Sequence, residues 1–412
     1  MLERIRNAIR LYQGLPKDIY VIALARFILG LGNFIIPFLV LLFTQKLDYS
    51  PSVAGGLAMS VTALYLLGGL LGGKLSDSFG HKRVLIWGEL LGAILLLVCG
   101  FFPESHLYTP MLLFVSYFFF GVAVPASMAL VGDLSTPKNR DAVMSLSYLA
   151  YNLGSGVGPI LAGYLFWNYT AWIFWGNGLA ALIGVLIILI GVNSTHQTQH
   201  DQEHSELEKA TDGSIWKVLS LRPRLIVFTL LCGVLWFSLN QMTMTTPLYL
   251  SHLFDKQGAI LFGQLMTFAS ILVVLITPIL MQMTKTQCEI KSLAWSGGLF
   301  AFGYWLVFIN SSIPMQFVAW FFLSAAEVLL LTKEGVYLAN HSPSSHRGRI
   351  NGVLSTLRNV MVMPSYILVG VYIEQQGYQN TWLTIIACSV IASMLLLALS
   401  IQQQQKTLSV KA

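Results

Sequence analysis

GKLSDSFGHKR, residues 73–83, is a short polar and basic turn between two long apolar runs, 53–73 and 84–101. Runs of this length allow a helix to cross the roughly 30 Å hydrocarbon core of a bilayer. Gly73 and Gly80 suit a point where two helices end and restart close together, because glycine accepts backbone angles and contacts that other residues resist. The stretch therefore predicts two membrane-spanning helices joined by a tight turn.

The composition of the whole chain agrees with a membrane protein. Of 412 residues, 55% are hydrophobic and 10% are charged, whereas roughly 25% are charged in soluble domains. The apolar runs are too long and too numerous for barrel strands. We predict an all-α membrane protein with twelve transmembrane helices, at 19–43, 53–73, 84–101, 111–132, 142–166, 171–192, 225–250, 259–281, 292–309, 313–336, 350–372 and 381–401.

The basic residues predict how the chain is oriented. Nineteen Lys and Arg residues lie in the predicted loops on the side of the two termini, and two, Lys46 and Lys256, lie on the other side. Basic loops stay in the cytoplasm, so we expect a multi-pass protein of the cell (inner, cytoplasmic) membrane with both termini cytoplasmic. No small-residue cleavage site follows the first run, which we expect to be a retained span. The net charge of +6 then reflects topology, and no nucleic-acid partner is needed to explain it.

The chain divides into two halves of similar length. A polar segment at 193–224 reads as a cytoplasmic linker between a six-helix bundle at 1–192 and another at 225–412. A shift of 207 residues superposes Arg140 on Arg347, Asn152 on Asn359 and Gly163 on Gly370, as expected of parallel repeats. The linker histidines lie in a solvated polar segment, and the four cysteines have no metal-ligand spacing. We therefore predict no metal site.

The turn at 73–83 resembles the loop signature G-x-L-x-D-R-x-G-R-[KR] of the major facilitator superfamily of twelve-helix transporters. Its matching and basic positions are Gly73, Leu75, Asp77, Gly80, Lys82 and Arg83, whereas Ser78 and His81 stand where the family usually has Arg. The resemblance implies two pseudo-symmetric bundles with a substrate site between them, opened alternately to each side. It also implies that Asp77 is a gate residue near the start of the eleventh span, close to Arg347 and Arg349.

The alternative for this turn is that Lys82 and Arg83 only enforce topology. His81 carries a charge only part of the time near neutral pH, so the gate is expected to be weaker or pH-sensitive compared with one built on Arg.

The fifth span carries a glycine-rich motif at 154–163, GSGVGPILAG. Gly154, Gly158, Pro159 and Gly163 resemble the fifth-span signature G-x-x-x-G-P-x-x-G-G of the drug:proton antiporter branches, and this resemblance implies export. The alternative is ordinary helix packing, because glycines four apart admit another backbone closely. These branches have an Arg in the fourth span that relays protons. In this chain the corresponding position is Tyr117, so the proton-relay role cannot be assigned to it.

Five ionisable side chains fall within predicted spans: Arg26, Glu89, Glu327, Glu334 and Arg358. A charge at mid-bilayer costs about 2.5–3.5 kcal/mol and so marks function or a buried pair. Glu327 lies midway along its span, and Glu334 projects from the same face two turns nearer the cytoplasm. Because a carboxyl without a counter-charge holds a proton readily in hydrocarbon, we predict Glu327 as the proton carrier, exchanging protons with cationic substrate or with movement of Arg358.

Alternatives remain for these charges. A Glu327–Arg358 salt bridge would hold the tenth and eleventh spans together, and Lys333 and Glu89 read as anchors near the cytoplasmic surface. We expect Glu334, Arg358, Arg26 and Asp133 to take part in proton coupling together with Glu327. Arg26 has Glu89 or Asp133 as its possible partners, and it either holds an anionic substrate group, compensates a relay carboxylate or makes a structural pair. The polar and aromatic positions suited to a substrate cavity are Asn33, Tyr117, Tyr151, Asn152, Trp236, Asn240 and Gln241.

The sequence thus predicts a monomeric secondary transporter, a proton-coupled exporter of small amphipathic molecules or drugs that needs no cofactor beyond the proton gradient. An exporter or flippase for a specific metabolite or lipid-linked molecule is the alternative, because Arg26 suits an anionic head group. A membrane enzyme or a receptor is a third class. The absence of a metal-ligand cluster, a nucleophile–base pair and an Asp-rich phosphate motif in the sequence argues against an enzyme.

Overall fold

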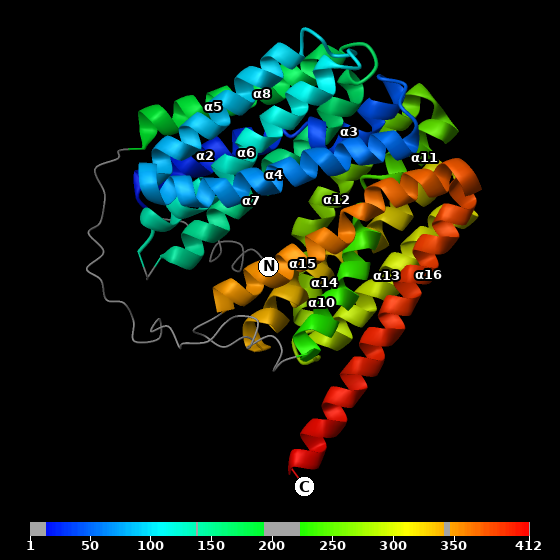
Figure 1. The fold of residues 1–412 in the computed structure, drawn as a ribbon. Helices are drawn as coiled ribbons and strands as arrows, with labels where there is room; N and C mark the ends of the chain where they lie inside the picture. Colours follow the sequence, from blue (N-terminus) through cyan, green and yellow to red (C-terminus); the bar gives the residue numbers. More distant parts are fainter. Residues whose placement is uncertain (1–13, 137–138, 193–222, 342–346, 412) are drawn as a thin grey trace. The chain divides into compact units, whose positions relative to one another are not determined.

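The computed structural model describes residues 14–136, 139–192, 223–341 and 347–411, and every regular element in these ranges is an α-helix (Figure 1). The helices are α2 (Lys17–Leu31), α3 (Ile35–Gln45), α4 (Pro51–Phe79), α5 (His81–Cys99), α6 (Tyr108–Asp133), α7 (Arg140–Leu165), α8 (Thr170–Gly191), α10 (Pro223–Asn240), α11 (Thr245–Phe254), α12 (Lys256–Met283), α13 (Glu289–Ile309), α14 (Ile313–His341), α15 (Arg347–Val362) and α16 (Pro364–Lys411).

The described helices are those of a multi-pass membrane protein. Nine segments within these ranges are long and apolar enough to cross a bilayer. Helices α5 and α7 are not among them, although they cover the predicted spans 84–101 and 142–166: α5 contains Lys82, Arg83 and Glu89, and α7 is richer in polar residues. An all-helical membrane protein is therefore confirmed, while the count of twelve spans stays a prediction.

Three of the apolar segments contain a break in the helix. The segment Lys17–Gln45 is interrupted between α2 and α3, and Arg224–Phe254 is interrupted between α10 and α11. The segment Val353–Gln402 leaves helical geometry at Gly377, where φ is 74° and ψ is 174°. Glycine tolerates this positive φ, and it lies between the two predicted spans 350–372 and 381–401. One apolar segment there thus corresponds to two predicted spans.

The described chain forms two compact units. Unit 1 contains residues 14–49, 56–136, 139–192 and 250–270, and unit 2 contains 50–55, 223–249, 271–341 and 347–411. Most of unit 1 comes from the predicted first bundle, but it also includes the beginning of α12. In unit 2, the first residues of α4 join the C-terminal helices, where the Ser52 N–H donates to Glu374 Oε1 at 2.7 Å.

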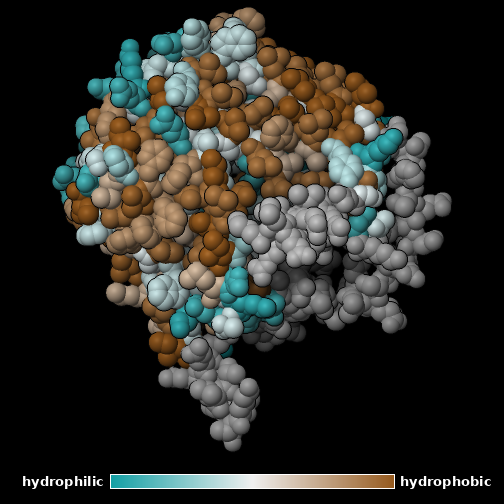
Figure 2. All heavy atoms as spheres, turned by 180° about the vertical axis from the view of Figure 1, so that it is seen from behind, coloured by the Kyte–Doolittle hydropathy of each residue, from teal (hydrophilic) through white to brown (hydrophobic). Residues whose placement is uncertain are grey.

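The core of unit 1 is built from small and branched residues on five helices. Buried residues of one cluster include Ala25 of α2, Leu85 of α5, Ala123 of α6, Val143 of α7 and Ile188 of α8. The outward faces are just as apolar: Leu70 is 68% exposed and Ile190 is 83% exposed. Figure 2 shows hydrophobic residues across most of the visible face of the described chain. Exposed apolar area of this extent is what lipid contact requires.

Glycines bring α4 and α6 into backbone contact. A methyl group placed on Gly68 or Gly72 of α4 would collide with the Phe118 or Val122 backbone of α6, and one on Gly121 would collide with Tyr65. Small residues let membrane helices approach closely and gain dispersion contacts. Gly73, one residue further along α4, has no atom within 4 Å of the same methyl position.

This contrast generates a stability prediction with an adjacent control. In Gly72→Ala, the new Cβ would lie 2.7 Å from Val122 Cα, and we expect overpacking to destabilise the fold by about 1–3 kcal/mol. Gly73→Ala meets open space and should be neutral or slightly stabilising, since alanine favours helix. Thermal unfolding in detergent measures both variants. Equal midpoints for the two would contradict a close α4–α6 contact at Gly72.

Candidate functional site

Unit 2 holds a buried carboxylate with two partners. Glu334 of α14 accepts a hydrogen bond from Arg358 Nη1 of α15 at 2.7 Å on Oε1, and one from Trp236 Nε1 of α10 at 2.7 Å on Oε2. The Arg358 guanidinium also lies over the Trp236 ring, 4.1 Å from its centroid. Side-chain exposure is 14% for Arg358 and 5% for Glu334. We call these three residues the unit 2 triad, in which each side chain contacts the other two.

The partner of Arg358 differs from the predicted alternative. We considered a Glu327–Arg358 salt bridge, and this is wrong: the cation pairs with Glu334, seven residues further along α14. Seven residues correspond to about 10 Å along a helix. Heptad spacing places both acids on one face of α14, but only the residues on neighbouring helices decide which of them meets the cation.

Glu327 is the carboxylate left without such a partner. It is partly buried in α14 and makes no hydrogen bond or ion pair with any residue that the structure describes. Tyr304 of α13 interacts with it electrostatically, and the Tyr304 hydroxyl is occupied in donating to the Ser238 carbonyl at 2.6 Å. Two acids on one helix face therefore have different environments: Glu334 has two partners, whereas Glu327 has no hydrogen bond or ion pair among the described residues.

Lys333 does not reach water as a surface anchor, so this prediction is wrong. The residue is 8% exposed, and its Nζ donates to the Thr284 carbonyl at 3.2 Å, just beyond the end of α12. Carbonyl groups at a helix C-terminus lack intrahelical donors and attract cations. The lysine thus ties α14 to the end of α12.

Unit 1 holds a second polar cluster, centred on Arg26 of α2. Its Nη2 donates to Ser127 Oγ of α6 at 2.9 Å, while its buried Nε has no hydrogen-bond partner among the described residues. Glu89, Tyr65 and Tyr151 lie close enough to interact with it electrostatically. No ion pair within 4 Å joins Arg26 to Glu89 or any other acid in the described ranges, so its charge is only partly compensated.

The predicted cavity residues fall into different surroundings. Tyr117 and Tyr151 lie near the Arg26 cluster, and Trp236 belongs to the unit 2 triad. Asn33 lies in the break between α2 and α3, and Asn152 donates to the Tyr148 carbonyl of its own helix.

Asn240 and Gln241 lie at the end of α10. The Gln241 side chain donates to the Phe237 carbonyl and accepts from Thr245 Oγ1, so it braces the α10–α11 break. For the rest of the set, a role in binding a substrate stays a prediction.

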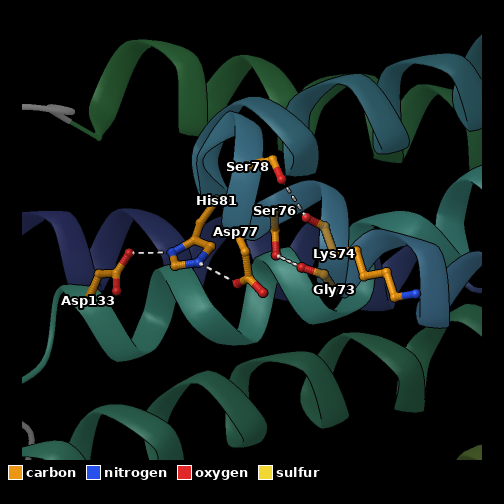
Figure 3. A network of polar contacts seen from close by, with 7 residues as sticks. All are labelled: Gly73, Lys74, Ser76, Asp77, Ser78, His81 and Asp133. Atoms are coloured by element: carbon orange, nitrogen blue, oxygen red, sulfur yellow. Dashed lines mark hydrogen bonds and ion pairs between the residues drawn. The ribbon is translucent and has the colours of Figure 1, made fainter.

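The turn at 73–83 forms a compact polar network at the ends of three helices (Figure 3). Gly80 separates α4 from α5 with a φ of 89°, a left-handed conformation that favours glycine. His81 Nδ1 lies 2.6 Å from Asp133 Oδ2 of α6, and its Nε2 lies 4.0 Å from Asp77 Oδ1. We predicted Asp133 as a coupling residue and a possible partner of Arg26, but the structure pairs it with His81.

The predicted gate contact of Asp77 involves residues whose side chains lie outside the described part of the chain. Asp77 itself is 81% exposed, and the Arg347 and Arg349 side chains are not described. The gate therefore stays a prediction. Lys82, by contrast, donates to the Val192 carbonyl at 2.6 Å, at the C-terminal end of α8.

The glycine motif of α7 serves two packing surfaces within unit 1. Gly154 and Gly158 face α2, where a methyl group on Gly158 would lie 2.9 Å from the Leu31 carbonyl oxygen. A methyl group on Gly163 would lie 2.8 Å from the Ala259 carbonyl oxygen of α12, and Pro159 faces Gly263. Close packing, the alternative given for this motif, is present at these glycines, and the sequence carried no signal for the two partner helices.

Several residues of these clusters carried no sequence signal. Tyr65, Ser127 and Tyr304 are single polar groups in apolar helices, and only neighbouring helices give them a role. Among the residues that the structure describes, no group of His, Cys, Asp and Glu could hold a metal ion.

Comparison with known proteins places these clusters in a transporter. One relative, the Na(+), Li(+), K(+)/H(+) antiporter of Planococcus maritimus, is 22% identical over 394 residues, which cover 85% of this chain and 91% of the relative. The bicyclomycin resistance protein homolog of Haemophilus influenzae is 30% identical over 158 residues, which cover 38% of this chain and 39% of that protein.

Solved transporter structures share the fold. The POT family transporter PepTSo superposes with a TM-score of 0.75 at 15% identity, covering 95% of this chain and 99% of that one. A variant of the nucleoside transporter NupG gives a TM-score of 0.74 at 14% identity, covering 92% and 98%. The family model of the Major Facilitator Superfamily matches residues 22–290. This match covers more than half of the chain, so the protein belongs to the major facilitator superfamily and is a transporter rather than an enzyme.

Proposed function

We propose that this transporter is a proton-coupled antiporter that exports small amphipathic molecules, drugs among them, and that Glu327 carries the proton. The observation that carries the proposal is the contrast on α14: Glu334 is held by two partners, whereas Glu327 has no hydrogen bond or ion pair among the described residues. An ionised carboxylate in an apolar span costs free energy that a protonated one does not. Glu327 is therefore suited to exchange a proton during each transport cycle.

A cationic cargo gives a simple coupling scheme. Glu327 binds a proton from outside, releases it to the cytoplasm, and in its ionised form attracts the cation that is to be exported. Glu334 stays occupied by Arg358 and Trp236, which keeps one negative charge compensated throughout. The unit 2 triad thus limits the exchange to one carboxylate, and the proton gradient supplies the energy without a bound cofactor.

Export is supported by two further observations. The glycine motif of α7 resembles the fifth-span signature of antiporter branches, and two relatives are named as a cation/proton antiporter and a drug-resistance homolog. The proposal includes twelve helices in two bundles, a monomer, and a cytoplasmic membrane with both termini inside. The excess of basic residues in the loops on the side of the termini supports this orientation.

A second candidate is an exporter or flippase for a specific metabolite or lipid-linked molecule with an anionic group. The Arg26 cluster favours it, because this partly buried guanidinium has one unsatisfied nitrogen and no ion pair within the described residues. Arginine binds carboxylate and phosphate groups through two parallel hydrogen bonds. The variant Arg26→Gln tests this candidate. The candidate is favoured if the variant still exports cationic dyes but no longer transports one anionic cargo.

Replacing Glu327 by glutamine tests the coupling. The amide keeps the size and polarity of the side chain but binds no proton at neutral pH, so we expect proton-driven uptake of a cationic dye into inverted vesicles to fall to background. Aspartate at the same position should retain part of the activity. Na⁺ and K⁺ are tested in the same vesicles, because one relative exchanges these ions.

Glu104→Gln serves as the control for the vesicle experiment. Glu104 is a 55% exposed loop residue paired with Lys46, and its variant should transport like the unmodified protein. Undiminished gradient-driven transport in Glu327→Gln would contradict the role of Glu327.

Breaking the unit 2 triad should destabilise the protein. Arg358→Met leaves Glu334 buried without its cation, and the expected loss is about 3–5 kcal/mol of unfolding free energy. The double variant Glu334→Gln/Arg358→Met should lose less than the sum of the two single variants, because neither charge is then left uncompensated. Unfolding in detergent gives the three values.

An ion pair with one exposed partner provides the comparison for these variants. Glu104→Gln breaks the Lys46–Glu104 pair, in which Glu104 is 55% exposed, and should cost about 0–1 kcal/mol. Additive losses in the Glu334 and Arg358 variants would contradict a direct interaction between the two side chains.

A further inference from the structure

An apolar groove of about 340 Å³ opens on the surface of unit 1, between α4 and α5 and over α6. Large side chains line it and remain well exposed: Phe79 is 62% exposed and Trp87 is 60% exposed. Arg83 is the one charged residue of the lining. The groove is separate from the Arg26 cluster and from the unit 2 triad, and the transport proposal makes no use of it.

The two walls of the groove follow the helical repeat. Leu71, Leu75 and Phe79 recur every four residues along α4, and Arg83, Trp87 and Leu91 do so along α5. The first and last residues of each series are eight positions apart, which corresponds to about 12 Å along a helix axis. Both series begin at the polar turn around Gly80 and run into the apolar span. The groove therefore has a polar end at Arg83 and an apolar end at Leu91.

Backbone contacts hold the floor of the groove in place. Gly72 of α4 lies against the Val122 backbone of α6, and a methyl group on Gly88 of α5 would lie 2.9 Å from the Phe119 carbonyl oxygen. Phe119 and Val122 belong to the lining. Because both walls are packed on the same helix through glycine, the groove is formed without any occupant.

The charges around the polar end favour an anion at Arg83. The guanidinium is exposed and forms no ion pair with any residue in the described ranges. Both nearby acids, Asp77 and Asp133, face His81 instead (Figure 3). Lys82 donates to the Val192 carbonyl. Arg83 is thus the cation at this end of the groove that no acid among the described residues compensates.

We infer that this groove binds an anionic phospholipid, with one acyl chain along Leu75, Trp87 and Leu91 and the phosphate on Arg83. A guanidinium matches phosphate oxygens with paired donors. Tryptophan is favoured at the boundary between head groups and hydrocarbon, where Trp87 lies one turn from Arg83. A chain of apolar CH₂ groups would fill a groove of about 12 Å that no side chain in the described ranges covers.

Native mass spectrometry of the full-length protein, purified and delipidated in detergent, tests the inference. Phosphatidylglycerol and phosphatidylcholine with the same acyl chains are added separately, and bound lipid is counted. In Arg83→Gln, we expect phosphatidylglycerol affinity to fall about fivefold, as expected for one basic residue, with phosphatidylcholine binding unchanged. Trp87→Ala should weaken both lipids, because it removes a wall shared by both acyl chains.

Two matched controls separate this site from general lipid contact. Lys74→Gln removes an exposed cation of the same turn that does not line the groove, and Trp295→Ala removes a tryptophan that is 57% exposed on α13 in unit 2. Both should bind lipid as the unmodified protein does. Thermal midpoints establish that all variants are folded. If Trp87→Ala does not fold, Arg83→Lys replaces it as the second variant. Arg83→Lys should keep part of the preference for phosphatidylglycerol over phosphatidylcholine.

Three results would overturn the inference. One is equal phosphatidylglycerol binding by Arg83→Gln and the unmodified protein. Another is an equal loss of binding in Lys74→Gln, which would show a diffuse charge effect. The third is displacement of phosphatidylglycerol by glycerol phosphate alone at equal concentration, which would show that the groove adds nothing to head-group binding.

Discussion

Close approach of helix backbones at glycine is the constraint on which the rest of this structure depends. Gly68 and Gly72 admit α6 against α4, Gly154 admits α2 against α7, and Gly263 admits α7 against α12. Apolar side chains gain little by leaving lipid for one another, so dispersion contacts at short range carry much of the association. Each such contact also fixes the rotation of a helix and hence the direction of its polar residues.

Once the helices are placed, each ionisable group takes its role from its neighbours. The two acids of α14 differ because Trp236 and Arg358 reach Glu334 and no described residue donates to Glu327. In unit 1, Arg26 donates to Ser127 and has only more distant electrostatic neighbours, so no ion pair within the described residues compensates its charge. A glutamate or an arginine is therefore held in an ion pair at one position and left without an ion-pair partner among the described residues at another.

The turn at 73–83 depends both on backbone geometry at a glycine and on the neighbours of its charged groups. Gly80 supplies the left-handed residue that reverses the chain between α4 and α5, and His81 then engages the acids of two helices. This arrangement leaves Arg83 directed to the groove beside Trp87. A loop that resembles a gating signature thus also provides the polar end of a surface that faces lipid.

The sequence by itself determined the class of the protein, most of its apolar spans and its family, because hydropathy over a whole helix and the glycine turn are local properties. It also identified Glu327, Glu334, Arg26 and Arg358 as the costly charges. The sequence could not determine their partners: Arg358 pairs with Glu334 instead of Glu327, Asp133 meets His81 instead of Arg26, and Lys333 is buried against the Thr284 carbonyl. Helical periodicity places a residue on a face, but the packing of other helices decides what that face meets. Only the tertiary structure could therefore distinguish the carboxylate that is paired with a cation from the one that has no such partner among the described residues.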